Sequence, residues 1–103
     1  MTKELEKSLE VLRRQKPYLH EAYGVNAIGV FGSFARGKQD QRRKRSDIDI
    51  MVELDERAHV GFFKFFELEE YLRRRLRRKV DLVTKDAIKP ATEKNIFKDM
   101  IYV

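Results

Sequence analysis

Two aspartates stand two positions apart in the segment Asp47–Glu53, whose side chains alternate between polar and apolar. This alternation predicts a β-strand, in which successive side chains point to opposite faces of the sheet. Asp47 and Asp49 should therefore project from one face, where their carboxylates repel and raise each other's pKa. Mg²⁺ usually neutralises such carboxylates together with the phosphates of a substrate. Taken alone, the pair is equally consistent with an edge strand that has one exposed face.

A Gly-Ser dipeptide, Gly32-Ser33, directly follows the short apolar run Ala27–Phe31. The run is rich in β-forming residues and is bounded by turn residues, so it predicts a buried strand. Glycine lets the backbone approach a bulky anion closely. The Ser33 hydroxyl and the amides that follow can then donate hydrogen bonds to phosphate oxygens. By itself, however, the dipeptide is also typical of an ordinary turn.

A third acid, Asp81, interrupts the short apolar segment Val80–Val83. A charged side chain in such a strand is unfavourable unless it is paired or exposed. If this strand lies beside the Asp47–Glu53 strand, three carboxylates gather opposite the Gly-Ser turn. That combination is typical of a two-metal site for phosphoryl or nucleotidyl transfer.

The rest of the chain must provide the elements that position these residues. Apolar residues recur at helical spacing between residues 3 and 23, although Pro17 predicts that one helix ends near Gln15 and another begins. Asp86 is predicted to cap a last helix that extends to Met100. The predicted elements are helices over 3–23, 61–79 and 86–100, strands over 27–31, 47–53 and 80–83, and a helical turn over 34–38. Their order is α-β-β-α-β-α.

Length and composition limit what this scaffold can be. The chain has 103 residues and is expected to form one domain over residues 1–103. It has no cysteine, which excludes disulfides, thiolate nucleophiles and cysteine-based zinc sites. No apolar run approaches the length of a membrane span, and the charged first residues lack a secretory signal. A cytoplasmic protein with no membrane partner is therefore expected.

The net charge of +6 is concentrated in two segments. Lys38–Arg45 contains five basic residues and one acid, and Arg73–Lys79 contains six basic residues and no acid. Such runs favour polyanionic partners, namely nucleotide phosphates, RNA or an acidic protein. A solvated loop and a solvated helix face explain them equally well.

The segments Gly32–Gly37 (GSFARG) and Ser46–Ile50 (SDIDI) together resemble the signature of the DNA polymerase β-like nucleotidyltransferase superfamily. More narrowly, the chain is similar over nearly its whole length to the minimal nucleotidyltransferases (MNT), which are antitoxins found beside HEPN-domain toxins. The resemblance implies a two-layer α+β fold with a small mixed sheet covered by helices. The sequence departs from the compact family form in its longer and more basic loop between Ser33 and Asp47.

The resemblance also implies roles for individual residues. Gly32 and Ser33 would hold the β- and γ-phosphates of ATP, and Arg36 would be a further phosphate contact. Asp47 and Asp49 would each bind Mg²⁺, with two ions in the site.

Asp81 would complete the metal site on the acceptor side and help to deprotonate the attacking hydroxyl. The implied reaction is ATP-dependent transfer of AMP to a hydroxyl, a tyrosine of a HEPN toxin, which silences the toxin. Two alternatives remain at this stage: an inactive antitoxin that only docks onto its toxin, and a basic module that binds nucleic acid.

Overall fold

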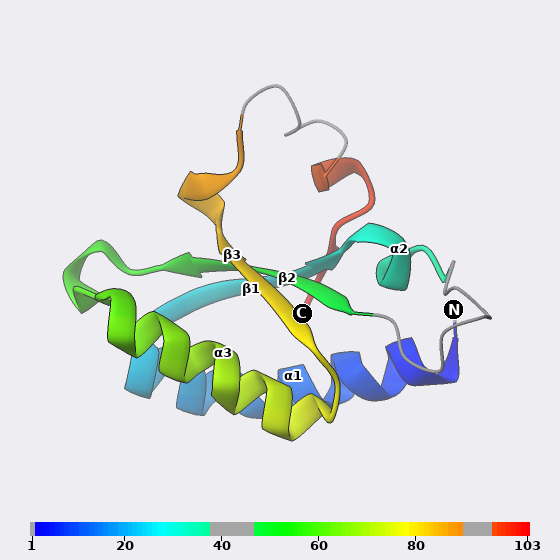
Figure 1. The fold of residues 1–103 in the computed structure, drawn as a ribbon, viewed down its shortest axis with the longest axis horizontal. Helices are drawn as coiled ribbons and strands as arrows, with labels where there is room; N and C mark the ends of the chain where they lie inside the picture. Colours follow the sequence, from blue (N-terminus) through cyan, green and yellow to red (C-terminus); the bar gives the residue numbers. More distant parts are fainter. Residues whose placement is uncertain (1, 38–46, 90–95) are drawn as a thin grey trace.

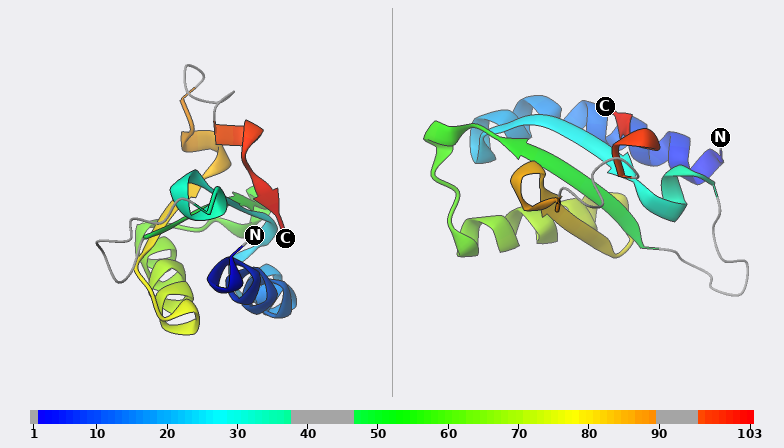
Figure 2. Two further views of the ribbon diagram at one scale, coloured as in Figure 1. Left: turned by 90° about the vertical axis from the view of Figure 1, so that its right-hand side faces the viewer. Right: turned by 90° about the horizontal axis from the view of Figure 1, so that it is seen from above.

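The computed structural model describes residues 2–37, 47–89 and 96–103. Its two long helices, α1 and α3, lie across one face of a four-stranded sheet, whereas residues 85–89 and 96–100 lie on the other face (Figures 1 and 2). The predicted α+β fold with a small mixed sheet is confirmed. The elements are α1 (Lys3–Tyr23), β1 (Val25–Phe31), α2 (Gly32–Ala35), β2 (Ile48–Leu54), η1 (Glu56–Ala58), α3 (Phe62–Leu76), β3 (Val80–Thr84), η2 (Lys85–Ala87) and β4 (Ile101–Tyr102).

The strands lie in the order β3-β2-β1-β4. β1 pairs antiparallel with both β2 and β4, whereas β2 and β3 run parallel. A parallel pair requires a crossover, and α3 provides it between β2 and β3. As a result, β2 lies in the interior of the sheet, and β3 lies at an edge of the sheet that the described residues form.

The core lies between the sheet and the helical layer. Alternate side chains of β2 face the helices, and Ile48, Ile50 and Val52 are fully buried there. On the other face, Asp49 and Glu53 are only partly buried, whereas Met51 between them is fully buried. The helices contribute most of the buried leucines of the core, which are Leu5, Leu9, Leu12, Leu19, Leu68 and Leu72.

Helix α1 runs without interruption through Pro17, so the predicted break near Gln15 is wrong. Proline removes only one backbone hydrogen bond, and Pro17 is on the exposed side of the helix. The fully buried side chains of Leu12 and Leu19, on either side of it, outweigh that loss. The helix ends at Gly24, whose φ of 71° is the left-handed conformation that glycine adopts readily. None of the helices in the described part of the chain is long and apolar enough to span a membrane.

The predicted helix from Asp86 to Met100 is wrong at its start, and among the described residues only 96–98 of it are α-helical. Lys85–Ala87 forms a single 3₁₀ turn, residues 96–98 form a helical turn, and Ile101–Tyr102 forms the fourth strand. Ile101 pairs with Val30 and packs against the core, which explains why this segment is a strand. The remaining residues of the predicted helix, 90–95, lie outside the described residues, as does the basic segment 38–45.

Candidate active site

The register of the sheet brings two of the predicted acids together. Asp49 of β2 pairs directly with Asp81 of β3, so both project from the face that the long helices leave open. Asp47 immediately precedes β2 and is exposed. The prediction that Asp81 stands on the strand beside the carboxylate pair is therefore confirmed.

Gly32 lies against the carboxylate of Asp49. A Cβ built on Gly32 would be 2.1 Å from Oδ2 of Asp49, which is far inside contact distance. Gly32 also has a φ of 79°, a conformation that side chains strongly disfavour. The carboxylate of Asp49 thus leaves no room for a side chain at position 32, so the start of α2 packs closely against β2.

The short helix α2 presents polar groups next to this carboxylate. Ser33 is exposed, whereas Phe34 is fully buried and anchors the turn in the core. The guanidinium of Arg78 lies over the Phe34 ring, 4.5 Å from its centroid. Because Phe34 is held from both sides, the backbone of the Gly-Ser turn has a defined position.

Arg36 follows α2 and extends toward the C-terminal segment. Its Nη1 donates to Oδ2 of Asp99 at 3.5 Å, and both side chains are substantially exposed. Asp99 is not among the residues predicted from the sequence. No local pattern could have found it, because the two residues are 63 positions apart and only the fold brings them together.

The acids interact electrostatically at this end of the sheet. The pKa of Asp49 is raised from 3.8 to about 6, mainly because the carboxylate is partly buried and secondly because Asp81 and Asp47 are negatively charged. Arg36 acts in the opposite direction and lowers it. The site therefore favours any bound species that brings positive charge.

The arrangement differs from a structural metal site. Within the described ranges, no three histidine, cysteine, aspartate or glutamate side chains converge closely enough to form a metal cage. Magnesium usually uses one or two carboxylates and completes its octahedron with water and substrate phosphates. The carboxylates of Asp47, Asp49 and Asp81 have the oxygen ligands that such an ion uses.

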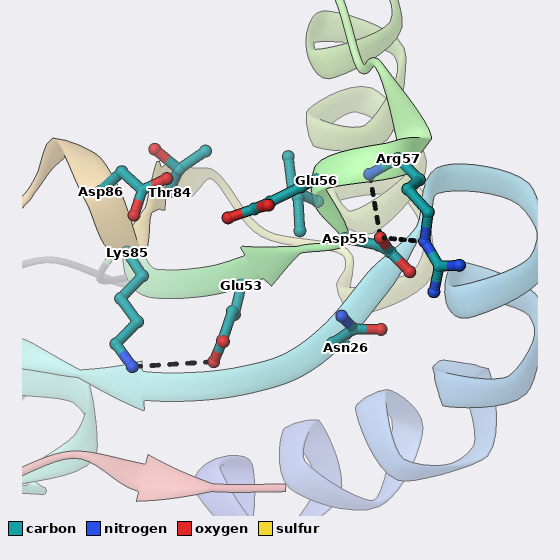
Figure 3. A pocket seen from close by; sticks show the side chains of 9 residues that line it. Asn26, Glu53, Asp55, Glu56, Arg57, Thr84, Lys85 and Asp86 are labelled. Atoms are coloured by element: carbon teal, nitrogen blue, oxygen red, sulfur yellow. Dashed lines mark hydrogen bonds and ion pairs between the residues drawn. The ribbon is translucent and has the colours of Figure 1, made fainter.

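A hollow of about 610 Å³ lies at the opposite end of β2 and contains none of the predicted site residues. Figure 3 shows two pairs among its charged side chains. Nζ of Lys85 is 3.8 Å from Oε2 of Glu53, and Asp55 is paired with Arg57. Because this hollow contains none of the predicted acids and two of its acids are already paired, the candidate active site is the Asp47–Asp49 end.

Comparison with protein families and with known sequences gives a consistent result. The model of the nucleotidyltransferase domain matches residues 12–103. A protein of Methanocaldococcus jannaschii, provisionally named protein adenylyltransferase MJ1379, is 47% identical over 102 residues, which are 98% of this chain and 99% of that protein. Protein adenylyltransferase MntA of Thermococcus cleftensis is 40% identical over 99 residues, which are 96% and 95% of the two chains.

Solved structures share the fold. One provisionally described as a minimal nucleotidyltransferase superposes with a TM-score of 0.73 and 28% identity, over 94% of this chain and 93% of that one. A toxin–antitoxin structure with AMP-PNP superposes with a TM-score of 0.57 and 25% identity, over 95% of this chain and 70% of that one.

Proposed function

This chain belongs to the nucleotidyltransferase family, and from that premise we propose that it transfers AMP from ATP to a hydroxyl group of a partner protein. The proposed acceptor is a tyrosine of a HEPN-domain toxin, so that the chain acts as its antitoxin. The observation that carries the proposal is the pairing of Asp49 with Asp81 beside Gly32. This pairing brings acids and a phosphate-binding turn to one end of the sheet.

In the proposed complex, the turn at the start of α2 binds the β- and γ-phosphates. The exposed Ser33 hydroxyl and the backbone amides donate hydrogen bonds to them, and Arg36 adds a guanidinium. Arg36 then leaves Asp99 and binds phosphate oxygens. Little free energy is lost in this step because the Arg36–Asp99 ion pair is long and exposed. The α-phosphate consequently lies next to Asp47 and Asp49.

Asp47, Asp49 and Asp81 are the residues that would hold two Mg²⁺ ions, which would supply charge neutralisation of the triphosphate and of the departing pyrophosphate. Asp81 is exposed on the edge strand β3, so an acceptor hydroxyl can reach it from solvent. Asp81 accepts the hydroxyl proton while the oxygen bonds to the α-phosphorus. The bond from that phosphorus to the bridging oxygen breaks, and pyrophosphate leaves.

A protein acceptor is supported by the names of the relatives, two of which are called protein adenylyltransferases. A toxin partner is supported by the structural similarity to a toxin–antitoxin complex that contains an ATP analogue. The choice of a HEPN toxin and of tyrosine rests on the resemblance of the GSFARG and SDIDI segments to the minimal nucleotidyltransferases.

The test is a labelling experiment with the HEPN toxin of the same organism and Mg²⁺. ATP labelled at the α-phosphate should leave label on the toxin, whereas ATP labelled at the γ-phosphate should release it only as pyrophosphate. Transfer of the γ-label to protein would instead identify a kinase. No label on the toxin, together with inhibition of the toxin by the double variant Asp47→Asn/Asp49→Asn as durable as with wild type, would identify a docking antitoxin.

A further inference from the structure

A second charged feature lies at the C-terminal end of α3. Five basic residues line one hollow of about 620 Å³, and they are Arg73, Arg74, Arg77, Arg78 and Lys79, here called the basic cluster. All the described residues that line this hollow are basic. Most of these side chains are exposed.

Stabilisation of the C-terminal end of α3 explains only part of this positive charge. Basic residues in the last turn interact favourably with the carbonyl end of a helix, and Arg73, Arg74 and Arg75 occupy that turn in α3. Arg77 is the C-cap residue of α3, and Lys79 comes two residues after it, outside the last turn of the helix. Like charges gathered around one hollow repel one another, and a polyanion would relieve that repulsion.

The basic cluster is joined directly to the candidate active site. The carbonyl of Lys79 accepts a hydrogen bond of 3.0 Å from the amide of Ile48, the residue between Asp47 and Asp49. Lys79 is two residues before Asp81, with the buried Val80 between them. Figure 1 shows the turn from α3 to β3 at the same end of the sheet as α2. The cluster therefore borders the side of the site at which Asp81 is exposed.

We propose that the basic cluster binds an acidic segment of the acceptor protein and so guides the acceptor hydroxyl to Asp81. This inference rests on the proposed function and adds the chemistry of its partner. RNA is the less favoured polyanion because base recognition in single strands relies on aromatic stacking, and none of the described residues that line the hollow is aromatic. The exposed phenylalanines Phe62, Phe63 and Phe66 lie in the opposite half of α3.

Binding can be measured without ATP or metal. The probe is a fluorescein-labelled peptide in which glutamates and aspartates surround one tyrosine, compared with the same peptide carrying glutamine and asparagine, and with a single-stranded oligouridylate. The test variant is Arg74→Gln/Arg77→Gln/Lys79→Gln, which retains the Arg73–Glu70 and Arg78–Phe34 contacts. The matched control is Lys3→Gln/Lys7→Gln/Arg13→Gln, three exposed residues of α1 that remove the same charge.

By fluorescence anisotropy at low salt, the acidic peptide should bind more tightly than the amide peptide and the oligouridylate. The test variant should weaken this binding by about tenfold, since each exposed charge contributes modestly, and the control should leave it nearly unchanged. The inference is overturned if both triple variants weaken binding equally, if the test variant binds like wild type, or if the oligouridylate binds more tightly than the acidic peptide.

Arg74→Glu alone provides a second test if the triple variant does not fold, because Arg74 is exposed on the surface of α3. Arg74→Glu should also weaken binding of the acidic peptide. Binding like that of wild type, or tighter binding of the oligouridylate, would again overturn the inference. If the labelling experiment shows no AMP transfer but the peptide still binds through the basic cluster, the proposed reaction fails and the docking surface stands. If transfer occurs and the peptide does not bind, the docking inference alone fails.

Discussion

The two ends of β2 carry similar numbers of acids in opposite circumstances. At its C-terminal end, Glu53 faces Lys85, and the carboxylate of Asp55 accepts a hydrogen bond of 2.9 Å from the amide of Arg57 (Figure 3). That hydrogen bond lowers the pKa of Asp55. At the N-terminal end, burial and neighbouring acids raise the pKa of Asp49 to about 6. The fold thus pairs Glu53 and Asp55 with basic residues at one end and leaves Asp49 repelled by Asp81 and Asp47 at the other, as expected where a site is arranged for a ligand.

The largest expected effect comes from replacing one acid at each end of β3. Asp81→Asn should lower the rate of AMP transfer by about 10²–10⁴, because the variant lacks the group that accepts the hydroxyl proton. Asp86→Asn, at the other end, should change the rate less than about twofold, as is usual for an exposed side chain away from the chemistry. Single-turnover kinetics with the labelled toxin measure both. Equal rates for Asp81→Asn and wild type would show that Asp81 is only a strand residue.

The next effect concerns the glycine beside Asp49. Gly32→Ala should lower the free energy of unfolding by about 2–3 kcal/mol, since the new methyl group collides with the carboxylate and the backbone is left-handed there. Gly61→Ala is the control, because no heavy atom lies within 4 Å of the added Cβ. Urea denaturation of the three proteins measures the difference. If Gly32→Ala is as stable as Gly61→Ala, the contact with Asp49 does not fix α2.

The smallest expected effect is a change in the free energy of unfolding whose sign differs between the two ends of β2. In the metal-free protein at neutral pH, Asp49→Asn should raise the free energy of unfolding, whereas Asp55→Asn should lower it. A pKa of about 6 instead of 3.8 corresponds to roughly 3 kcal/mol if fully expressed. Solvent screening at this partly exposed carboxylate reduces the expected gain to about 1 kcal/mol, or about 4–8 °C in Tm.

The pH dependence follows from the same shift. Because the folded protein holds the Asp49 proton more tightly than the unfolded chain, this group stabilises the fold fully below pH 3.8, and the contribution is lost as the pH rises through about 6. Thermal unfolding in EDTA between pH 4 and pH 8 should show this decline in wild type and less of it in Asp49→Asn. Identical pH profiles of the two proteins would mean that Asp49 is not the carboxylate that its surroundings destabilise.

The sequence was sufficient where a pattern is local. The alternation around Ile48 and Ile50 predicts strand β2 and the face of Asp49, and the apolar run around Asp81 predicts β3. The catalytic and binding roles of the six candidate residues remain predictions, and the kinetic and labelling experiments test them.

The sequence was insufficient where distant contacts decide the structure. Pro17 is a local signal for a break, but the leucines that keep α1 continuous are stabilised by the sheet. Strand β4 has only two residues, which is too short for a pattern, and it exists because β1 pairs with it. The Arg36–Asp99 contact likewise depends on the completed fold.

The position of Asp81 on an edge strand also affects how the protein behaves at high concentration. The outer edge of β3 offers backbone groups with which a second chain could pair, and charged side chains on an edge strand discourage such pairing. Neutralising Asp81 removes one of these charges from a strand that is otherwise apolar over Val80–Val83. Preparations of Asp81→Asn are therefore expected to self-associate more readily than wild type, and light scattering should accompany any kinetic measurement made on them.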